Sequence, residues 1–273
     1  MPHWQPSDTA TLTDRAYQEY ILRGVSRTFA LTIPELPGPL RHAVGNCYLL
    51  CRIADTIEDD PGLPPAAKRA LWRGLRAAVA GIRDPGSLAR DLDRALAPGT
   101  PAAERDLARN LPRVVRAARA ESRGARRAVL RCLATMTEGM AHFAERRSPA
   151  GLPDVAELER YCYHVAGVVG ELLTDLFAER LPALAARRSE LRALAASFGA
   201  GLQMVNILKD VREDRERGVC WLPRSLFARH GVDLARLPPL DHDPRWAAGV
   251  AEMTGLAHSH LGDARDYILG NPA

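Results

Sequence analysis

The segment LLCRIADTIEDDPG, residues 49–62, begins as an apolar helix and ends in four carboxylates. These are Asp55, Glu58, Asp59 and Asp60. The C-terminus of a helix carries partial negative charge, so acidic side chains there repel both the helix end and one another. A rotation of about 100° per residue places Asp55 and Asp59 on one face, one turn apart, with Tyr48 and Arg52 on the same stripe.

The same spacing returns in GLQMVNILKDVREDRERG, residues 201–218. Asp210 and Asp214 lie one turn apart near the end of an apolar helix, shortly before a glycine. The polar residues that share or border their stripe are Gln203, Asn206 and Glu213. A single acidic pair at this spacing is usually a solvated helix face that costs only a few tenths of a kcal/mol, and neighbouring basic residues could neutralise the second pair. Two such pairs in one chain favour a functional interpretation.

A divalent cation would explain both acidic segments. Hard cations prefer oxygen ligands, and Mg²⁺ typically binds one or two carboxylates together with phosphate oxygens and water. Such an ion removes the repulsion between the carboxylates and stabilises a diphosphate leaving group. The pattern therefore predicts ionisation of an allylic diphosphate in an apolar helical pocket.

The elements that must position these residues are predicted to be helices. The 273 residues are rich in Ala, Leu and Arg, and no sustained alternation of Val, Ile and Thr indicates a strand. Helix-breaking proline and glycine residues divide the chain into predicted helices at about 13–23, 38–59, 64–82, 101–120, 124–146, 154–178, 187–216 and 245–269. No connection resembles a long linker, so we expect a single all-α domain over residues 1–273.

Composition excludes some classes of function. A net charge of +4, from 37 basic and 33 acidic residues, does not indicate nucleic-acid binding. Five scattered cysteines without a C-x-x-C motif indicate reduced thiols in a cytoplasmic protein. The sequence shows no secretory signal and no apolar run near the roughly 20 residues that span a bilayer.

One stripe of basic residues could allow the protein to associate with a membrane surface. Its residues are Arg105, Arg109, Arg113, Arg116 and Arg119. At helical spacing they share a face that could dock on an anionic membrane and help to discharge a lipid product. The competing interpretation is an ordinary solvated helix face. The sequence makes no prediction of oligomeric state.

Three longer blocks resemble the squalene/phytoene synthase family of head-to-head prenyltransferases. They read SRTFALTIPELPGPLRHAVGNCYLLCRIADTIEDD, YCYHVAGVVG and FGAGLQMVNILKDVREDRERGVCWLP, and they follow the family's order from Ser26 to Pro223. The sequence of the first block resembles squalene synthases more closely than phytoene synthases. The resemblance implies an all-α isoprenoid synthase fold, a single helical domain around a central cavity. Family members commonly continue with further C-terminal helices, which implies a short chain or a fragment.

The resemblance also implies roles for individual residues. Mg²⁺ ligands would be Asp55, Glu58, Asp59, Asp210, Glu213 and Asp214. Residues that match diphosphate-contacting or neighbouring positions are Ser26, Arg27, Arg52, Gln203, Asn206, Lys209 and Arg217. Residues that match the reaction centre are Tyr48, Arg52 and Tyr161, with Tyr161 as proton acceptor.

Each of these residues also has a structural interpretation. Ser26 could cap a helix, and Arg27 and Arg52 could pair with nearby acids. Tyr48 and Tyr161 could be core aromatics. Gly167 and Gly170, with Ala166, could serve close helix packing rather than leave room for a prenyl chain.

The function implied by the resemblance is Mg²⁺-dependent condensation of two farnesyl diphosphates to presqualene diphosphate and, with NADPH, to squalene. Because no glycine-rich dinucleotide motif follows a strand, NADPH would bind in a non-Rossmann manner. The alternatives are phytoene synthesis from geranylgeranyl diphosphate, and a reaction that stops at presqualene diphosphate or hydroxysqualene. An alternative of another class is an inactive family member that acts as an assembly or binding protein.

Overall fold

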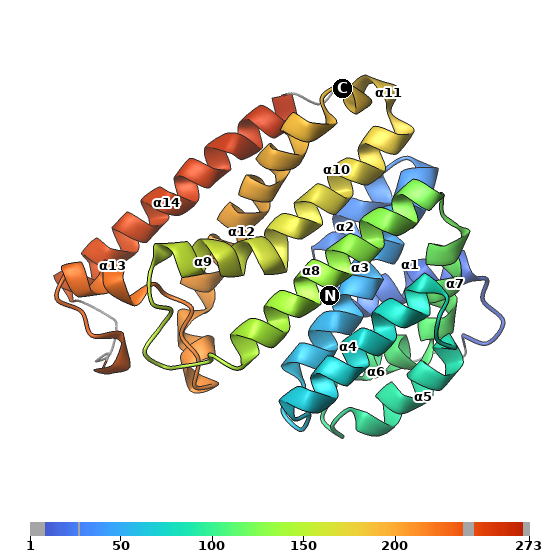
Figure 1. Ribbon diagram of the computed structural model, residues 1–273, viewed down its shortest axis with the longest axis horizontal. Coiled ribbons are helices and arrows are strands. Elements are labelled where there is room, and N and C mark those ends of the chain that lie inside the picture. Colours follow the sequence, from blue (N-terminus) through green and yellow to red (C-terminus); the bar gives the residue numbers. More distant parts are fainter. Residues whose placement is uncertain (1–8, 27, 237–242, 270–273) are drawn as a thin grey trace. The chain divides into compact units, whose positions relative to one another are not determined.

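The structure, a computed structural model, describes residues 9–26, 28–236 and 243–269 (Figure 1). The chain divides into two compact units, Met1–Thr137 and Glu138–Ala273. The described residues form helices and no strand, with one isolated bridge between Leu152 and Pro223. The predicted all-α class is therefore confirmed, whereas the single domain and its central cavity stay predictions.

The first unit is built from short and medium helices. They are α1 (Asp14–Val25), α2 (Phe29–Thr32), η1 (Ile33–Glu35), α3 (Gly38–Asp59), α4 (Pro65–Ala80), α5 (Pro85–Ala95), α6 (Ala102–Arg109) and α7 (Leu111–Ala120). Helix α8 (Arg123–Ala144) contains the boundary between the units.

The second unit contains the longest helices. Its elements are α9 (Val155–Cys162), η2 (Tyr163–Gly167), α10 (Val168–Arg180), α11 (Pro182–Ala185), α12 (Arg188–Glu216), α13 (Arg224–Arg229), η3 (Leu234–Arg236) and α14 (Pro244–Leu269). Within this unit α12 packs against α10 and α14, and Figure 1 shows α14 running alongside α12.

Helices α5, α6 and α7 differ from the predicted helices. The predicted helix at 101–120 is two helices, α6 and α7, that meet at Asn110. Pro112, at the start of α7, has no N–H to continue the ladder of α6. Helix α5 was not predicted, although Asp84 caps it by accepting a hydrogen bond from Ser87 N at 2.6 Å.

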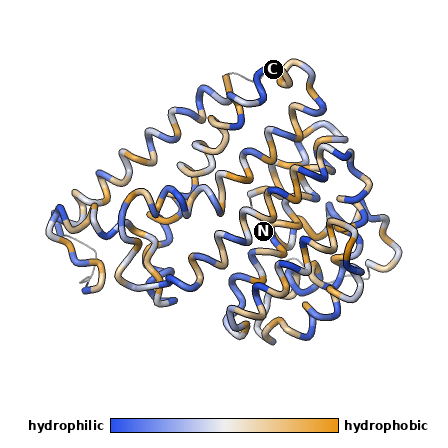
Figure 2. Tube along the Cα trace, viewed as in Figure 1, coloured by the Kyte–Doolittle hydropathy of each residue, from blue (hydrophilic) through white to orange (hydrophobic). Residues whose placement is uncertain are grey.

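Helix α3 is buried on the side opposite its carboxylates. Leu50, Ile53 and Ile57 are all at most 2% exposed. The indole of Trp72 donates a hydrogen bond to Ala54 O at 3.1 Å, which ties α4 to this buried side. Apolar burial therefore fixes the rotation of α3 and with it the face on which Tyr48, Arg52 and Asp55 must lie. Figure 2 shows the corresponding mixture of apolar and polar residues along the helices.

Close glycine contacts hold α12 in the second unit. A Cβ added at Gly170 on α10 would lie 2.2 Å from Ala195 O, and one added at Gly199 would lie 2.6 Å from Ala166 O. Real side chains do not reach such distances, so the helices approach one another through these glycines. The packing interpretation of Gly170 and its neighbours is confirmed.

A π-helical turn, η2, joins α9 to α10. The N–H of Val168 reaches back to Tyr163 O, one residue further than in an α-helix. The predicted helix at 154–178 is therefore continuous but contains one wide turn. Such turns occur frequently at functional sites.

Among the described helices, α12 is long and apolar enough to cross a membrane by length and composition alone. Its most apolar stretch has a mean hydropathy of 1.3 and is 33% buried. A core helix of a soluble protein passes the same test, and α12 packs between neighbouring helices of its unit.

We expect Gly170→Ala to destabilise the protein by about 1–3 kcal/mol, the usual cost of overpacking a close contact. The reason is the 2.2 Å approach of the new Cβ to Ala195 O. The matched control is Gly255→Ala on α14, where nothing beyond the neighbouring backbone of its own helix lies within 4 Å of the added Cβ. That change should be neutral or stabilising, because Ala favours a helix more than Gly. Urea denaturation measures both, and equal stabilities would contradict the close packing of α10 on α12.

Candidate functional site

Asp55, Glu58 and Asp59 lie at the C-terminal end of α3 and form what we call the first carboxylate strip. Asp55 is only partly exposed, and burial together with repulsion from Glu58 raises its pKa to about 7. Arg52 opposes this increase, whereas Asp59 and Glu104 add to it. The strip therefore concentrates negative charge that its own unit does not fully compensate.

Arg52 is held by an acid that sequence reasoning did not identify. Its Nη2 donates to Glu104 of α6 in an ion pair. The other oxygen of Glu104 accepts a hydrogen bond from Thr56 Oγ1 at 2.9 Å. Arg52 Nε is buried and has no hydrogen-bond acceptor in the described structure. The signal in the sequence was an acidic residue in the first turn of a helix, which is too common to single out.

Tyr48 and Ser26 lie together at the other end of the strip. The hydroxyl of Tyr48 donates to Val25 O at 2.9 Å, and burial raises its pKa. Ser26 is the C-cap residue of α1, and its Oγ accepts a hydrogen bond at 2.9 Å from Phe29 N, the first residue of α2. Ser26 is thus not the N-cap of α2, which is Thr28, although its side chain binds the first N–H of that helix. Arg27 lies outside the described residues.

The remaining acids of the first segment differ in their surroundings. Asp59 is exposed, and the backbone oxygen of Glu58 accepts a hydrogen bond from Lys68 Nζ. Asp60 is buried and accepts hydrogen bonds from Gly62 N at 2.8 Å and Ala97 N at 2.7 Å. Asp60 therefore organises the loop after α3, which leaves Asp55, Glu58 and Asp59 as the candidate ligands.

Asp210, Glu213 and Asp214 form the second carboxylate strip, at the C-terminal end of α12. Burial, with repulsion from Asp210 and Glu213, raises the pKa of Asp214, while Arg217 and Arg147 oppose the increase. Helix α12 ends at Glu216 with Arg217 as its C-cap residue, and Gly218 follows with φ +74°. The structure thus gives Asp214 the same kind of environment as Asp55, a partly buried carboxyl among like charges.

Basic residues do not simply neutralise this second strip. Lys209 Nζ lies 3.5 Å from Asp210 Oδ1, but the lysine side chain is 70% exposed. Arg215 turns away and donates to Leu234 O at 3.2 Å. The neutralisation interpretation therefore holds only in part.

Exposed apolar side chains accompany the polar residues of α12. Gln203 is partly buried and Asn206 is exposed. Between and beside them Leu202 and Val205 are 47% and 42% exposed, whereas Met204 on the opposite side is fully buried. A polar strip with adjoining exposed apolar residues can contact both a charged head and an apolar tail.

Tyr161 lies in an aromatic cluster of the second unit. Its ring is stacked on Trp221 at 4.1 Å between centroids and meets Phe143 edge-on at 5.1 Å. The side chain is 7% exposed. These contacts are those of a core aromatic, and its role as proton acceptor stays a prediction.

Neither strip forms a complete metal site on its own. Among the described residues, no three His, Cys, Asp or Glu side chains lie together in a group that could hold a metal ion. Mg²⁺ commonly takes only one or two carboxylates and completes its shell with phosphate oxygens and water. The oxygen donors of each strip therefore suit Mg²⁺ that arrives with a diphosphate.

The basic stripe is engaged within its own unit. Arg105 and Arg109 each lie 3.0 Å from Asp93 Oδ1, and Arg116 Nε lies 2.7 Å from Asp14 Oδ2. Carbonyl oxygens accept hydrogen bonds from the other two members, which are Arg113 and Arg119. The structure therefore supports intramolecular pairing for the stripe, and membrane contact stays a prediction. All five cysteines are free and buried, as predicted.

Comparisons with known proteins agree on one family. A family model described as squalene/phytoene synthase matches residues 22–273. A squalene synthase of Schizosaccharomyces pombe is 31% identical over 262 residues, which cover 93% of this chain and 53% of the yeast protein. A phytoene synthase of Thermus thermophilus is 31% identical over 239 residues, which cover 88% of this chain and 69% of that protein. The chain thus spans about half the length of the yeast squalene synthase.

Solved structures show the same fold. The structure of TcSQS with the ligand BPH1237 matches with a TM-score of 0.73 and 25% identity over 95% of this chain and 72% of that one. The squalene synthase HpnC from Alicyclobacillus acidocaldarius matches with a TM-score of 0.67 and 17% identity, over 95% of this chain and 84% of that one. These matches confirm the predicted isoprenoid synthase fold.

We expect the stability of the metal-free protein to fall between about pH 4 and pH 7 because of Asp55, whose pKa rises from 3.8 to about 7. The folded state holds this proton more tightly than the unfolded chain. The resulting stabilisation is present at low pH and is lost as the pH rises through 7. Asp55→Asn should flatten this part of the profile and raise the melting temperature at pH 8. Thermal melts in EDTA with Glu179→Gln, an exposed change on α10, as control test this, and an unchanged profile would contradict it.

We expect a double-mutant cycle with Arg52→Met and Glu104→Gln to give a coupling energy of about 1–3 kcal/mol, because the two side chains are in contact and largely shielded from water. The side chains are 27% and 12% exposed. The exposed pair Arg187 and Glu190 provides the comparison and should couple much more weakly. Urea denaturation in EDTA measures both cycles. Coupling no larger than in the exposed pair would show that Glu104 does not hold Arg52.

Proposed function

Because the chain belongs to the squalene/phytoene synthase family, we propose that it catalyses Mg²⁺-dependent head-to-head condensation of two farnesyl diphosphates. The first product is presqualene diphosphate, and with NADPH the reaction continues to squalene. The observation that carries this proposal is the repeated pair of carboxylates at the ends of α3 and α12, in each of which burial and like charge raise a pKa.

The residues that would hold Mg²⁺ are Asp55, Asp59, Asp210 and Asp214, with Glu58 and Glu213 in support. When bound, Mg²⁺ supplies charge stabilisation for a leaving diphosphate. The donor set supports this assignment, since it consists of hard oxygen ligands whose mutual repulsion a cation would relieve.

Other residues of each unit would bind and orient the substrate. Arg52 has a buried Nε without an acceptor, and a diphosphate oxygen would supply one. Glu104 would keep this guanidinium in place before substrate arrives. On α12 the exposed side chains of Leu202 and Val205 would contact the prenyl chain and exclude water from the allylic carbon.

The assignment of farnesyl diphosphate rests on the sequence of the segment from Ser26 to Asp60, which is more similar to squalene synthases than to phytoene synthases. Phytoene synthesis from geranylgeranyl diphosphate is the second candidate, favoured by the similarity to the Thermus thermophilus phytoene synthase. A reaction that ends at presqualene diphosphate or hydroxysqualene is a third. No residues are assigned to NADPH, and the described helices include no strand-to-helix dinucleotide motif.

Product analysis with each diphosphate, with and without NADPH, tests the proposal. We expect farnesyl diphosphate to be preferred, presqualene diphosphate to accumulate without NADPH, and squalene to form with it. Asp55→Asn and Asp210→Asn should each lower turnover by about 10²-fold or more while the protein remains folded, since each removes a metal-binding charge. Glu179→Gln on α10 should retain full turnover.

Three outcomes would change the assignment. If phytoene formed from geranylgeranyl diphosphate were the main product, the assigned substrate would be wrong, but the assigned diphosphate site would stand. Full turnover in either aspartate variant would remove the metal assignment. No product from either substrate, with a folded sample and Mg²⁺, would favour an assembly or binding protein.

A further inference from the structure

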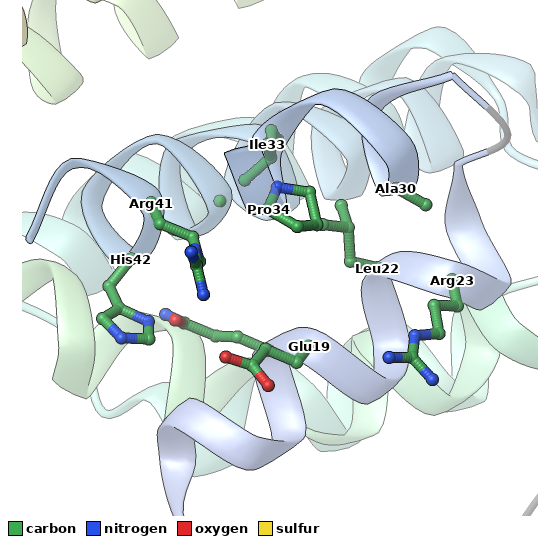
Figure 3. Close-up of a pocket in the computed structure, with 10 residues that line it drawn as sticks. Glu19, Leu22, Arg23, Ala30, Ile33, Pro34, Arg41 and His42 are labelled. Carbon is green, nitrogen blue, oxygen red and sulfur yellow. The ribbon is translucent and has the colours of Figure 1, made fainter. Parts of the chain in front are cut away.

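None of the residues that line a pocket in the first unit is among those assigned above. Its volume is about 220 Å³, and its lining comes from α1, α2, η1 and α3. The polar residues of the lining are Gln18, Glu19, Arg23, Arg41 and His42. Figure 3 shows the charged side chains of α1 and α3 around the space, with Leu22, Ile33 and Pro34 beside them.

Gln18 brings an unsatisfied acceptor to this pocket. The residue is 6% exposed, and its Nε2 donates to Asn46 Oδ1 at 2.8 Å. Asn46 in turn donates to Val114 O at 3.1 Å, which fixes the orientation of both amides. Gln18 Oε1 is buried and has no hydrogen-bond donor in the described structure. Since a buried acceptor without a partner is costly, a ligand in the pocket should carry an N–H or O–H.

The charges around the pocket indicate that the same ligand is an anion. Arg23 is exposed and Arg41 is partly buried, and neither forms an ion pair within the described part of the chain. Arg41 uses its Nε to donate to Leu36 O at 3.2 Å, which leaves its terminal nitrogens for another acceptor. His42 adds a further nitrogen, and Glu19 is the only acid among the lining residues. Two guanidinium groups against one carboxylate favour a negatively charged ligand.

We propose that this pocket binds a hydrogen phosphate group, either as inorganic phosphate or on a small organic molecule. Hydrogen phosphate combines the two required features in one group. Its P–OH can donate to Gln18 Oε1, while its unprotonated oxygens accept from Arg23 and Arg41. The apolar side chains of Leu22, Ile33 and Pro34 offer contact to an organic portion. The site is independent of the carboxylate strips and of the proposed condensation.

Calorimetric titration of the whole chain at pH 7 in EDTA tests this proposal with phosphate, isopentyl phosphate and sulfate. Sulfate has a similar size and charge but carries no proton at this pH. We expect sulfate to bind about tenfold or more weakly than phosphate, because it leaves Gln18 Oε1 without a donor. Tighter binding of isopentyl phosphate than of phosphate would identify an organic ligand, and weaker binding would identify the free ion.

Three variants locate the binding. Arg23→Gln should weaken phosphate binding by about tenfold, and Arg15→Gln, the matched loss of an exposed charge on α1 outside the pocket, should leave it unchanged. Gln18→Met should remove the preference for phosphate over sulfate. If this variant does not fold, the comparison of Arg23→Gln with Arg15→Gln still shows whether phosphate binds in the pocket.

Equal binding of phosphate and sulfate, equal weakening by both arginine variants, or no saturable binding of phosphate would overturn the proposal. Because EDTA removes Mg²⁺ and no prenyl diphosphate is present, these outcomes do not depend on the proposed condensation. Binding should also persist in Asp55→Asn, which separates this pocket from the carboxylate strip on α3.

Discussion

Repulsion between carboxylates at the ends of α3 and α12 is the constraint on which the rest of the structure depends. Each helix must keep acids on one face at the end where its own dipole opposes them. Neither helix can relieve the strain by turning, since Ile53 and Ile57 on α3 and Met204 on α12 are buried on the other side. The apolar core thus supplies the free energy that holds the charges together, and a bound cation would recover part of it.

The two units meet this constraint by different means. In the first, side chains surround the strip, with Glu104 holding Arg52 and Asp60 fastening the loop after α3 through Gly62 N and Ala97 N. In the second, backbones approach closely, since Gly170 and its neighbours bring α10 against α12. A hydrogen-bonded arrangement tolerates small shifts in helix position, whereas glycine contacts without intervening side chains fix the spacing.

The sequence predicted those parts of the structure that depend on local periodicity. The bounds of α3 agree with the predicted 38–59, and the buried faces of α3 and α12 lie where the apolar residues indicated. Contacts between helices were not predictable in the same way. Glu104 meets Arg52 only because α6 packs on α3, and the arginine stripe of α6 and α7 pairs with Asp14 and Asp93 from other helices. Such partners are distant in sequence, and helical spacing carries no information about them.

The wide turn of η2 has a consequence for the permitted length of the chain. One extra residue in an ordinary α-helix would rotate everything beyond it by about 100° relative to the residues before it. Tyr161 before the turn joins Trp221, while Gly170 after it faces Ala195. The wide turn absorbs its extra residue locally, so removing one residue from it would restore an ordinary α-helical turn and leave the contacts of α10 in place, whereas removing one residue from α10 itself would change them. Natural variation in chain length between α9 and α10 should therefore be confined to η2, as the loss of a single residue.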